Sequence, residues 1–374
     1  PVFRSFQAEL ENVFEEYNMY NDDMGTHQRQ FMYEHLYGGT PYDRDVIGYA
    51  KDLKNPSLQA LINFYNTWYV PNNMVLLLVG NFNAEQAKPL IETYFGRLTP
   101  KELPERPTYP KHDFSQDKKA YKLNVGYMPQ YIWAYQGLKM GDKESTALEF
   151  ALALLNNSHE TGLLDKLMLD GTVGGAYAQH DSRRIDGRLM VIGVPYYDMA
   201  TRSFDDAKTT EKLICKEIDK IMDPEKIPDW LFNSVKKQLL QEHEMMYEYQ
   251  SAKINILTYA YTYDIPLDEF INEDKEIAAL TKEQVAAVAK KYFDAPRCTL
   301  EFGEGEPQKN KLAKPAIKPL DPPKGVQTEY AKAFKNVPTT AVNVTYNDFS
   351  EVTHKEMSSN VNLHYTENTQ NDIF

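Results

Sequence analysis

Apolar residues recur at helical spacing in the first part of the chain. Between positions 3 and 20 they stand three or four residues apart, which predicts a helix with one apolar stripe. A second helix is predicted over about 27–36, because Gly38 and Gly39 follow the last apolar residue and end the pattern. The apolar stripe of the first helix consists of Phe6, Leu10, Val13, Phe14 and Tyr17.

A helix, a group of aromatic residues, a proline and an apolar run follow one another twice. In the first set Pro71 precedes the apolar run 74–79, which predicts a buried strand. In the second set Pro296 precedes the strand-like run 298–302. The helices before the two prolines are predicted over 57–64 and 285–289.

The spacing of these two sets indicates a long repeat. The two prolines lie 225 positions apart (296 − 71), far more than the period of a solenoid array. Because only about 70 residues precede Pro71, we expect an upstream segment on the order of a hundred residues in a parent protein. Polar alternation over 329–374, with Val342, Val344 and Tyr346 on one side, predicts the opening strands of a third unit.

The region between the two prolines predicts layers of helices and strands. Residues 121–127 alternate as a half-buried strand does, and 189–194 form a second strand-like run. Thr281 and Gln284 form a capping box at the start of a helix. This pattern predicts an α+β fold in which helices pack on one face of a sheet. Further helices are predicted over 83–96, 143–155, 163–169, 205–222 and 228–249.

Two stretches rich in proline and charged residues predict linkers between domains. We therefore expect the rear part of a first domain over 1–98 and a second domain over 119–303. The start of a third domain is expected over 329–374. The linkers between them cover 99–118 and 304–328.

Composition excludes several function classes. The chain has 374 residues and a net charge of −13, so a nucleic-acid backbone is not expected as a partner. The longest apolar run, 74–79, is far shorter than the about 20 residues that cross a bilayer, so no membrane span is expected. Cys215 and Cys298 form no CxxC motif. The compartment stays open between the periplasm and the cytoplasm.

No complete set of catalytic residues can be read from the sequence. The eight histidines include no pair four positions apart, and there is no phosphate-binding loop or nucleophile elbow. Glu9 and Glu16 lie seven positions apart and so share one face of the first helix, with Glu15 beside them. An acidic helix face is most often simply solvated.

Three segments resemble one family of enzymes. The runs ELENVFEE, YGGTPYDRDVIG and NFYNTWYVPNNMVLLLVGNFNAEQAKPLIETYFG occur in this order. They are similar to the pitrilysin/insulinase family of zinc metallopeptidases, the inverzincins, from just after their metal motif to the end of their first domain. The resemblance continues through most of residues 1–330. It implies repeated units of the LuxS/MPP-like metallohydrolase fold, each an antiparallel sheet with helices on one face.

The resemblance implies roles for the first helix. In the family two histidines and a glutamate on a later helix hold zinc, and the His-x-x-Glu-His motif also carries the general base. The match places the zinc ligand at Glu16 and an outer-shell acid at Glu9, with Glu15 as the alternative ligand. The histidine motif is absent from this chain. We therefore expect Zn²⁺ in the full-length protein and no catalytic zinc in this chain alone.

A second segment, SHETGLLDKL, is similar to the family's His-Glu and glycine-rich segment that holds the N-terminus of a substrate. The resemblance implies that backbone groups near the glycines pair with an extended peptide and that a carboxylate meets its ammonium group. An equally weighted alternative is a helix entry with ordinary turn chemistry. The residues concerned are His159, Glu160, Gly162, Gly174 and Gly175.

The resemblance implies part of a zinc endopeptidase that degrades peptides in an enclosed chamber. Its partners are peptide substrates and the remaining domains of the same parent chain. Asp170 stands where short family members carry an arginine seven residues before the tyrosine at Tyr177, which favours a long, four-domain parent. An inactive homologue that acts as a scaffold or substrate-binding subunit is the alternative. An unrelated α+β binding protein would require the YVPNNMVLLLVG match to be accidental.

Overall fold

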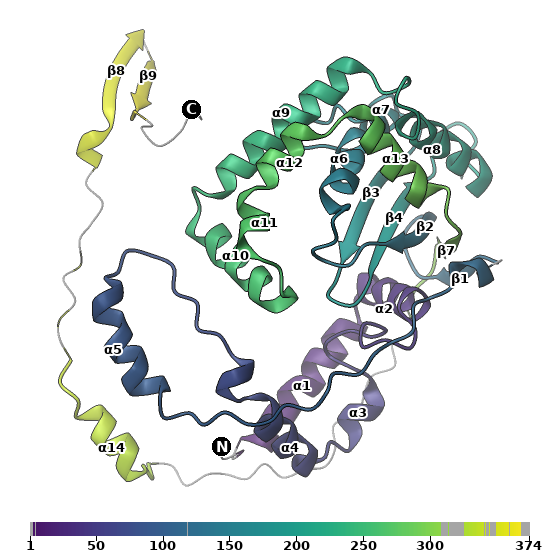
Figure 1. Ribbon diagram of the computed structural model, residues 1–374. Helices are drawn as coiled ribbons and strands as arrows, with labels where there is room; N and C mark the ends of the chain where they lie inside the picture. Colours follow the sequence, from purple (N-terminus) through teal and green to yellow (C-terminus); the bar gives the residue numbers. More distant parts are fainter. Residues whose placement is uncertain are drawn as a thin grey trace. The chain divides into compact units, whose positions relative to one another are not determined.

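The computed structural model describes residues 3, 5–117, 119–307, 313, 325–339, 341, 344, 349–358 and 360–367. The chain forms two compact units, over residues 3–318 and 319–374. Figure 1 shows the elements in the order of the chain. The predicted domain boundaries at 99–118 and 304–328 stay predictions.

The first unit begins with the predicted helices. They are α1 (Phe6–Asn21) and α2 (Met24–Leu36), followed by the short α3 (Ala50–Lys54). Leu10 and Phe14 of the predicted stripe are buried and pack against residues of α3. The apolar spacing therefore predicted both the helix and its buried face.

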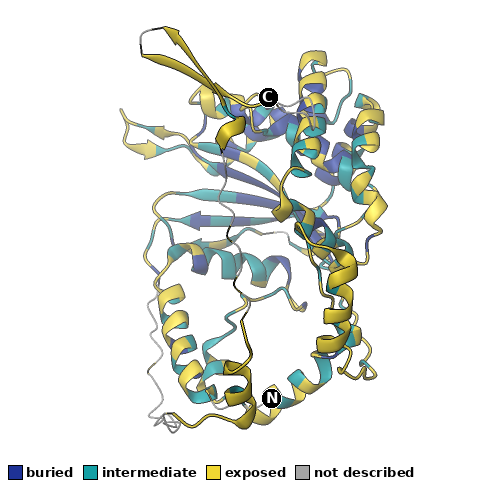
Figure 2. Ribbon diagram, turned by 90° about the vertical axis from the view of Figure 1, so that its left-hand side faces the viewer, coloured by how far each residue is buried: buried dark blue, intermediate teal, exposed yellow. Residues whose placement is uncertain are grey.

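Residues 58–95 include two helices that have no buried residue and are exposed over most of their length (Figure 2). They are α4 (Leu58–Trp68) and α5 (Ala84–Phe95), separated by the 3₁₀ turn η1 (Pro71–Asn73). The predicted strand over 74–79 is wrong, because these residues have no regular structure and Met74 and Leu78 are 47% and 46% exposed. A strand needs hydrogen-bond partners on a neighbouring strand, and the described residues provide none here.

A five-stranded sheet forms the centre of the rest of the unit. The strand order is β1-β7-β2-β4-β3, with β1 parallel to β7 and the other neighbours antiparallel. This confirms the predicted α+β fold. It also adds two strands that the sequence pattern did not predict, β2 and β3. The strands are β1 (Tyr121–Asn124), β2 (Gln130–Gly137), β3 (Gly175–Ser182), β4 (Gly187–Val194) and β7 (Arg297–Gly303).

Helices cover one face of this sheet, as predicted (Figure 1). Side chains such as Trp133 and Val191 point from the sheet into the core beneath the helices, where Leu148 and Val285 are fully buried. The elements on this side are α6 (Ser145–Leu155), α7 (Leu163–Leu169), α8 (Ala207–Ile221), α9 (Asp229–Met246), α12 (Glu273–Ala279) and α13 (Lys282–Phe293). The small hairpin β5 (Tyr197–Asp198) and β6 (Ser203–Phe204), and the helices α10 (Gln250–Tyr263) and α11 (Leu267–Ile271), complete the unit.

The opposite face of the sheet is also covered, by the end of α2 and by the turn η2 (Phe114–Gln116). Leu36, Tyr37 and Phe114 pack there against the sheet. Arg188 of β4 is fully buried between them and donates from Nε to the Leu36 carbonyl oxygen at 2.7 Å. Its Nη1 donates to Asp186 Oδ2 at 2.7 Å. The first part of the chain is therefore fixed to the sheet through a buried arginine.

The unit over 319–374 contains a helix and a hairpin. Strands had been predicted for 329–374, but residues 329–335 form α14 (Glu329–Lys335), because Thr328 caps a short helix-forming run. The hairpin is β8 (Thr353–Ser358) and β9 (Val361–Tyr365), preceded by η3 (Phe349–Glu351). Val342 and Tyr346 lie outside the described residues, and Val344 is in no regular element. None of the helices described in either unit has the length and apolar character needed to cross a membrane.

Candidate functional site

The loop between α6 and α7 is braced by hydrogen bonds from a side chain of α7 and from one of its own. The buried Asp165 accepts hydrogen bonds from the backbone N–H groups of Asn157 at 3.0 Å and Gly162 at 2.9 Å. Asn157 Oδ1 in turn accepts from the N–H groups of His159 at 3.1 Å and Thr161 at 3.3 Å. Asn and Asp form such local bonds readily, so this sequence specifies a rigid loop.

His159 and Glu160 form the exposed tip of this loop. The backbone of Glu160 has a φ of 54°, in the left-handed region that residues other than glycine rarely adopt. Ser158 beside them donates to Glu242 Oε1 of α9 at 2.9 Å, which ties the base of the tip to a long helix. The two side chains that the resemblance assigns to substrate binding are therefore accessible, on a backbone that hydrogen bonds hold in place.

Gly162 lies at the inner end of the same loop and is buried. A Cβ atom at this position would lie 2.2 Å from the Leu155 carbonyl oxygen and 2.7 Å from the Asn156 nitrogen. Its N–H is already bonded to Asp165. The structure thus gives Gly162 a packing requirement that is independent of any ligand.

Strand β3 lies at the edge of the sheet and begins at Gly175, directly after Gly174. The side chain of Asn156 bonds to the outer edge of this strand, donating to the Ala176 carbonyl at 3.1 Å and accepting from the Ala178 N–H at 2.9 Å. Asn156 also donates to Asp165. The predicted loop and the predicted glycines are thus joined through Asn156, which the sequence reasoning did not single out.

Glu9 and Glu16 are both exposed on α1. Glu9 Oε2 accepts from Asn12 Nδ2 at 3.3 Å. Glu16 lines a hollow of about 520 Å³ together with Val13, Tyr20, Arg29, Asp45, Val46 and Ile47. Within this hollow Arg29 is paired with Asp45, at 3.0 Å from Nε to Oδ1, and this partner raises the pKa of the guanidinium.

The donors around Glu16 do not complete a zinc site. Zinc in proteins takes three or four nitrogen, sulfur or carboxylate ligands. Nowhere in the described part of the chain do three or more His, Cys, Asp or Glu side chains come together in a way that could hold a metal ion. Glu16 can supply one ligand from α1, and the other ligands of such a site are not among these residues.

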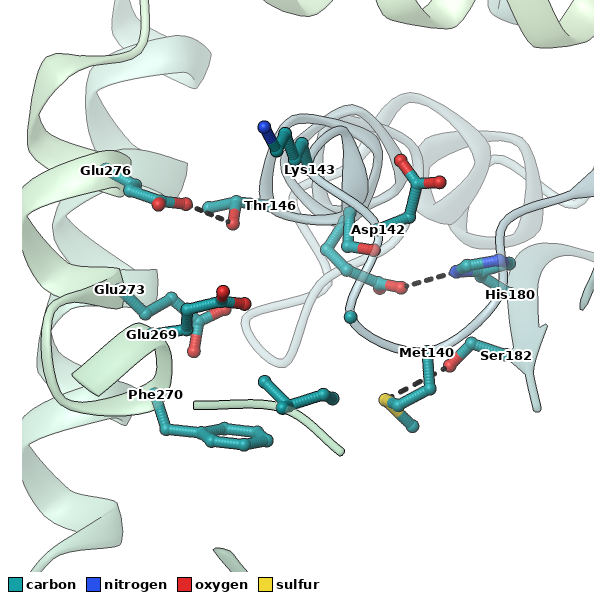
Figure 3. Close-up of a pocket in the computed structure, with 14 residues that line it drawn as sticks. Met140, Asp142, Lys143, Thr146, His180, Ser182, Glu269, Phe270, Glu273 and Glu276 are labelled. Atoms are coloured by element: carbon teal, nitrogen blue, oxygen red, sulfur yellow. Dashed lines mark hydrogen bonds and ion pairs between the residues drawn. The ribbon is translucent and has the colours of Figure 1, made fainter. Parts of the chain in front are cut away.

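A further hollow of about 420 Å³ lies between the start of α6, the end of β3 and α11–α12 (Figure 3). The side chain of His180 is fully buried at one side, where its Nδ1 lies 3.0 Å from Glu149 Oε1. Burial raises the pKa of Glu273, and Glu276 and Glu149 raise it further. The carboxylates that line this hollow come from positions between 142 and 276. They give the hollow a negative potential that favours cationic groups.

Comparison with known proteins gives matches in sequence and in fold. Residues 56–239 match the family described as the Peptidase M16 inactive domain. The zinc protease PqqE of Helicobacter pylori (strain ATCC 700392 / 26695) is 27% identical over 134 residues. That match covers 34% of this chain and 30% of the relative, so the chain spans about a third of the length of this curated protein.

Solved structures of proteases share the fold. A protease from Helicobacter pylori gives a TM-score of 0.68 at 18% identity, over 81% of this chain and 73% of that chain. The periplasmic protease PqqL from Escherichia coli gives a TM-score of 0.64 at 16% identity, over 96% of this chain and 41% of that chain. The sequence match and the shared fold confirm the resemblance that the motifs indicated. Residues 56–239 are therefore an inactive domain of the M16 family of pitrilysin-type peptidases, in a chain that shares the fold of these proteases.

Proposed function

We propose that this chain is the substrate-holding part of an M16-type zinc endopeptidase that degrades peptides in an enclosed chamber with the remaining domains of its parent. The observation that carries the proposal is the exposed edge of β3 beside the rigid, exposed tip at His159 and Glu160. An extended peptide can add to such an edge through main-chain hydrogen bonds. The Glu160 carboxylate can bind the ammonium group at the peptide's N-terminus.

Asn156 limits how much of a peptide this edge can hold. Its amide already bonds to Ala176 and Ala178, and the Gly174 N–H already donates to the Val194 carbonyl oxygen at 2.9 Å, so few backbone groups at this end of the strand are left for a ligand. A Cβ at Gly174 would lie 2.7 Å from the Pro195 carbonyl oxygen, which explains the glycine by packing. The arrangement therefore suits a short anchor for one end of a peptide rather than a long added strand.

Replacing Glu160 should separate binding from stability. We expect Glu160→Gln to weaken binding of a fluorescent peptide with a free N-terminus by about tenfold, the size of one charge-assisted hydrogen bond. Glu160→Gly should weaken binding equally and leave the unfolding midpoint unchanged or higher, because glycine adopts a φ of 54° without strain. Fluorescence anisotropy and thermal unfolding of the full chain measure the two effects.

An N-acetylated version of the same peptide is the control. Because it has no ammonium group, it should bind the unmodified chain and the Glu160→Gln variant equally well. Glu225→Gln, a change at another exposed glutamate, should leave both peptides unaffected. Equal binding of the free and acetylated peptides by the unmodified chain would rule out the ammonium contact.

We also propose that Glu16 is the zinc ligand that α1 contributes in the full-length protein, with Glu9 as an outer-shell acid. The exposure of Glu16 beside an open hollow supports this, because the carboxylate is accessible to ligands from elsewhere in the parent. Zinc bound there would polarise the scissile carbonyl. Glu9, two turns away on the same helix, can orient neighbouring ligands.

Elemental mass spectrometry of the full-length protein tests this assignment. We expect one zinc per chain, lost in Glu16→Gln and kept in Glu15→Gln, which is the matched neighbour on the same helix. If zinc is lost only in Glu15→Gln, the ligand is Glu15 and not Glu16. Absence of zinc from the unmodified full-length protein would contradict the peptidase and favour an inactive scaffold.

A further inference from the structure

The hairpin of the second unit brings two histidines face to face. His354 of β8 and His364 of β9 are directly opposite each other in the antiparallel register. Opposite residues of a strand pair lie on the same face, with their Cβ atoms about 5 Å apart. The pairing is regular from Thr353 to Glu356 and shifts only between Glu356 and Ser358, nearer to the turn, where Asn360 has a φ of 70°. The pair is therefore set by the backbone.

The two imidazole rings converge through equivalent atoms. Nδ1 of His354 and Nδ1 of His364 are hydrogen-bonded to each other, so one ring donates and the other accepts. The ring centroids lie 4.5 Å apart at an interplanar angle of 83°. Both side chains are exposed. Two nitrogens thus point at one position that solvent can reach.

Among the described residues of the hairpin, the next pair on this face carries groups that are compatible with a cation. Glu356 and Asn362 are the next opposite pair on the same side of the hairpin, two residues along each strand. Lys355, the basic residue between His354 and Glu356, alternates to the other face with Leu363. A positive ion between the histidines would therefore have a carboxylate nearby and no lysine on its own face.

We propose that His354 and His364 form a bidentate site for a divalent first-row transition metal, with Cu²⁺ bound more tightly than Zn²⁺. Two nitrogens on a tetrahedral ion at 2.0–2.1 Å stand about 3.3 Å apart, which a small rotation of the two rings provides. Water completes the coordination. The donating ring changes tautomer, its proton moving through water from Nδ1 to Nε2, so neutral histidines bind the ion without net proton release.

This site is distinct in composition from the zinc site proposed for the full-length enzyme, because it uses no residue of α1. It is also specific in chemistry. Mg²⁺ and Ca²⁺ take oxygen ligands, whereas the two imidazoles offer nitrogen. These ions should therefore not bind to the histidine pair. The proposal therefore distinguishes a transition-metal site from general attraction of cations to a chain with a net charge of −13.

Titration of the full chain with Cu²⁺ or Zn²⁺ against a chromophoric chelator tests the proposal. We expect one tight equivalent, with affinity reduced at least tenfold in His354→Ala and in His364→Ala, and no further loss in the double variant. The electron paramagnetic resonance spectrum of the Cu²⁺ form should show two nitrogen ligands, reduced to one or none in the single variants.

Two controls keep the test decisive. His159→Ala removes an exposed histidine elsewhere, and Leu363→Ala changes the opposite face of the same hairpin, so both should bind as the unmodified chain does. Unchanged Cu²⁺ affinity in His364→Ala, or an equal loss in Leu363→Ala, would overturn the proposal. Saturating Mg²⁺ should not compete, and competition by Mg²⁺ would indicate a carboxylate site instead.

Discussion

Replacing Arg188 by methionine should lower the free energy of unfolding by about 3–5 kcal/mol, as expected when one partner of a buried ion pair is removed. Arg188 is fully buried, and its loss leaves the nearly buried Asp186 without its cation. The Leu36 carbonyl loses its donor as well. The guanidinium also lies 4.5 Å from the ring centroid of Tyr37, a cation–π contact that methionine does not replace. Urea unfolding of the full chain measures the change.

Two further variants separate the buried charge from the lost packing. Asp186→Asn in the Arg188→Met background should recover at least about 1 kcal/mol, because no unpaired charge then remains buried. Arg44→Met is the matched control, since Arg44 and its partner Asp43 are 46% and 28% exposed and should contribute less than about 0.5 kcal/mol. A change of under about 1 kcal/mol in Arg188→Met would contradict the argument.

Replacing Gly162 by alanine should destabilise the unit over 3–318 by about 3 kcal/mol, at the upper end for an added methyl group in a packed site. The new Cβ would stand 2.4 Å from the Leu155 carbonyl carbon and 2.2 Å from its oxygen. These are backbone atoms at the end of α6, so relief requires a shift of the helix end or of the loop. The peptide anchor proposed at Glu160 should be lost together with stability.

Gly171→Ala is the control for Gly162. A Cβ at Gly171 meets no atom within 4 Å, but its φ is 63°, so we expect a cost of about 1–2 kcal/mol from backbone conformation alone. Thermal unfolding and peptide binding should therefore fall together in Gly162→Ala, whereas Gly171→Ala should retain binding. Equal stability of Gly162→Ala and the unmodified chain would mean that the loop is not closely packed.

Local sequence rules predicted the helices because caps and apolar spacing act over a few residues. The capping box is formed as predicted, with the Thr281 N–H donating to Gln284 Oε1 at 2.9 Å. Strand β2 was missed because both of its faces are buried. Trp133 packs under the helices and Ile132 against the side that α2 covers, so apolar residues do not alternate with polar ones.

The sequence indicated candidate site residues only where one short segment carries them. The segment SHETGLL includes His159 and Glu160, and the structure presents both at one exposed tip. Asn156 was not predicted as part of the site, because its role depends on a pairing with Ala176 and Ala178 that appears only when the sheet forms. The acidic hollow was missed for the same reason, since its lining residues lie as far apart as positions 140 and 276.

The amide of Asn156 has a consequence for self-association. An uncovered edge strand is a template on which a second copy of the same chain can add, and repeated addition leads to aggregates. The Asn156 amide bonds to the backbone groups of Ala176 and Ala178, and so interrupts the row of outward-facing backbone groups near the start of β3. The peptide anchor proposed above needs part of this edge open, and the amide of Asn156 shortens the stretch on which a second copy could add.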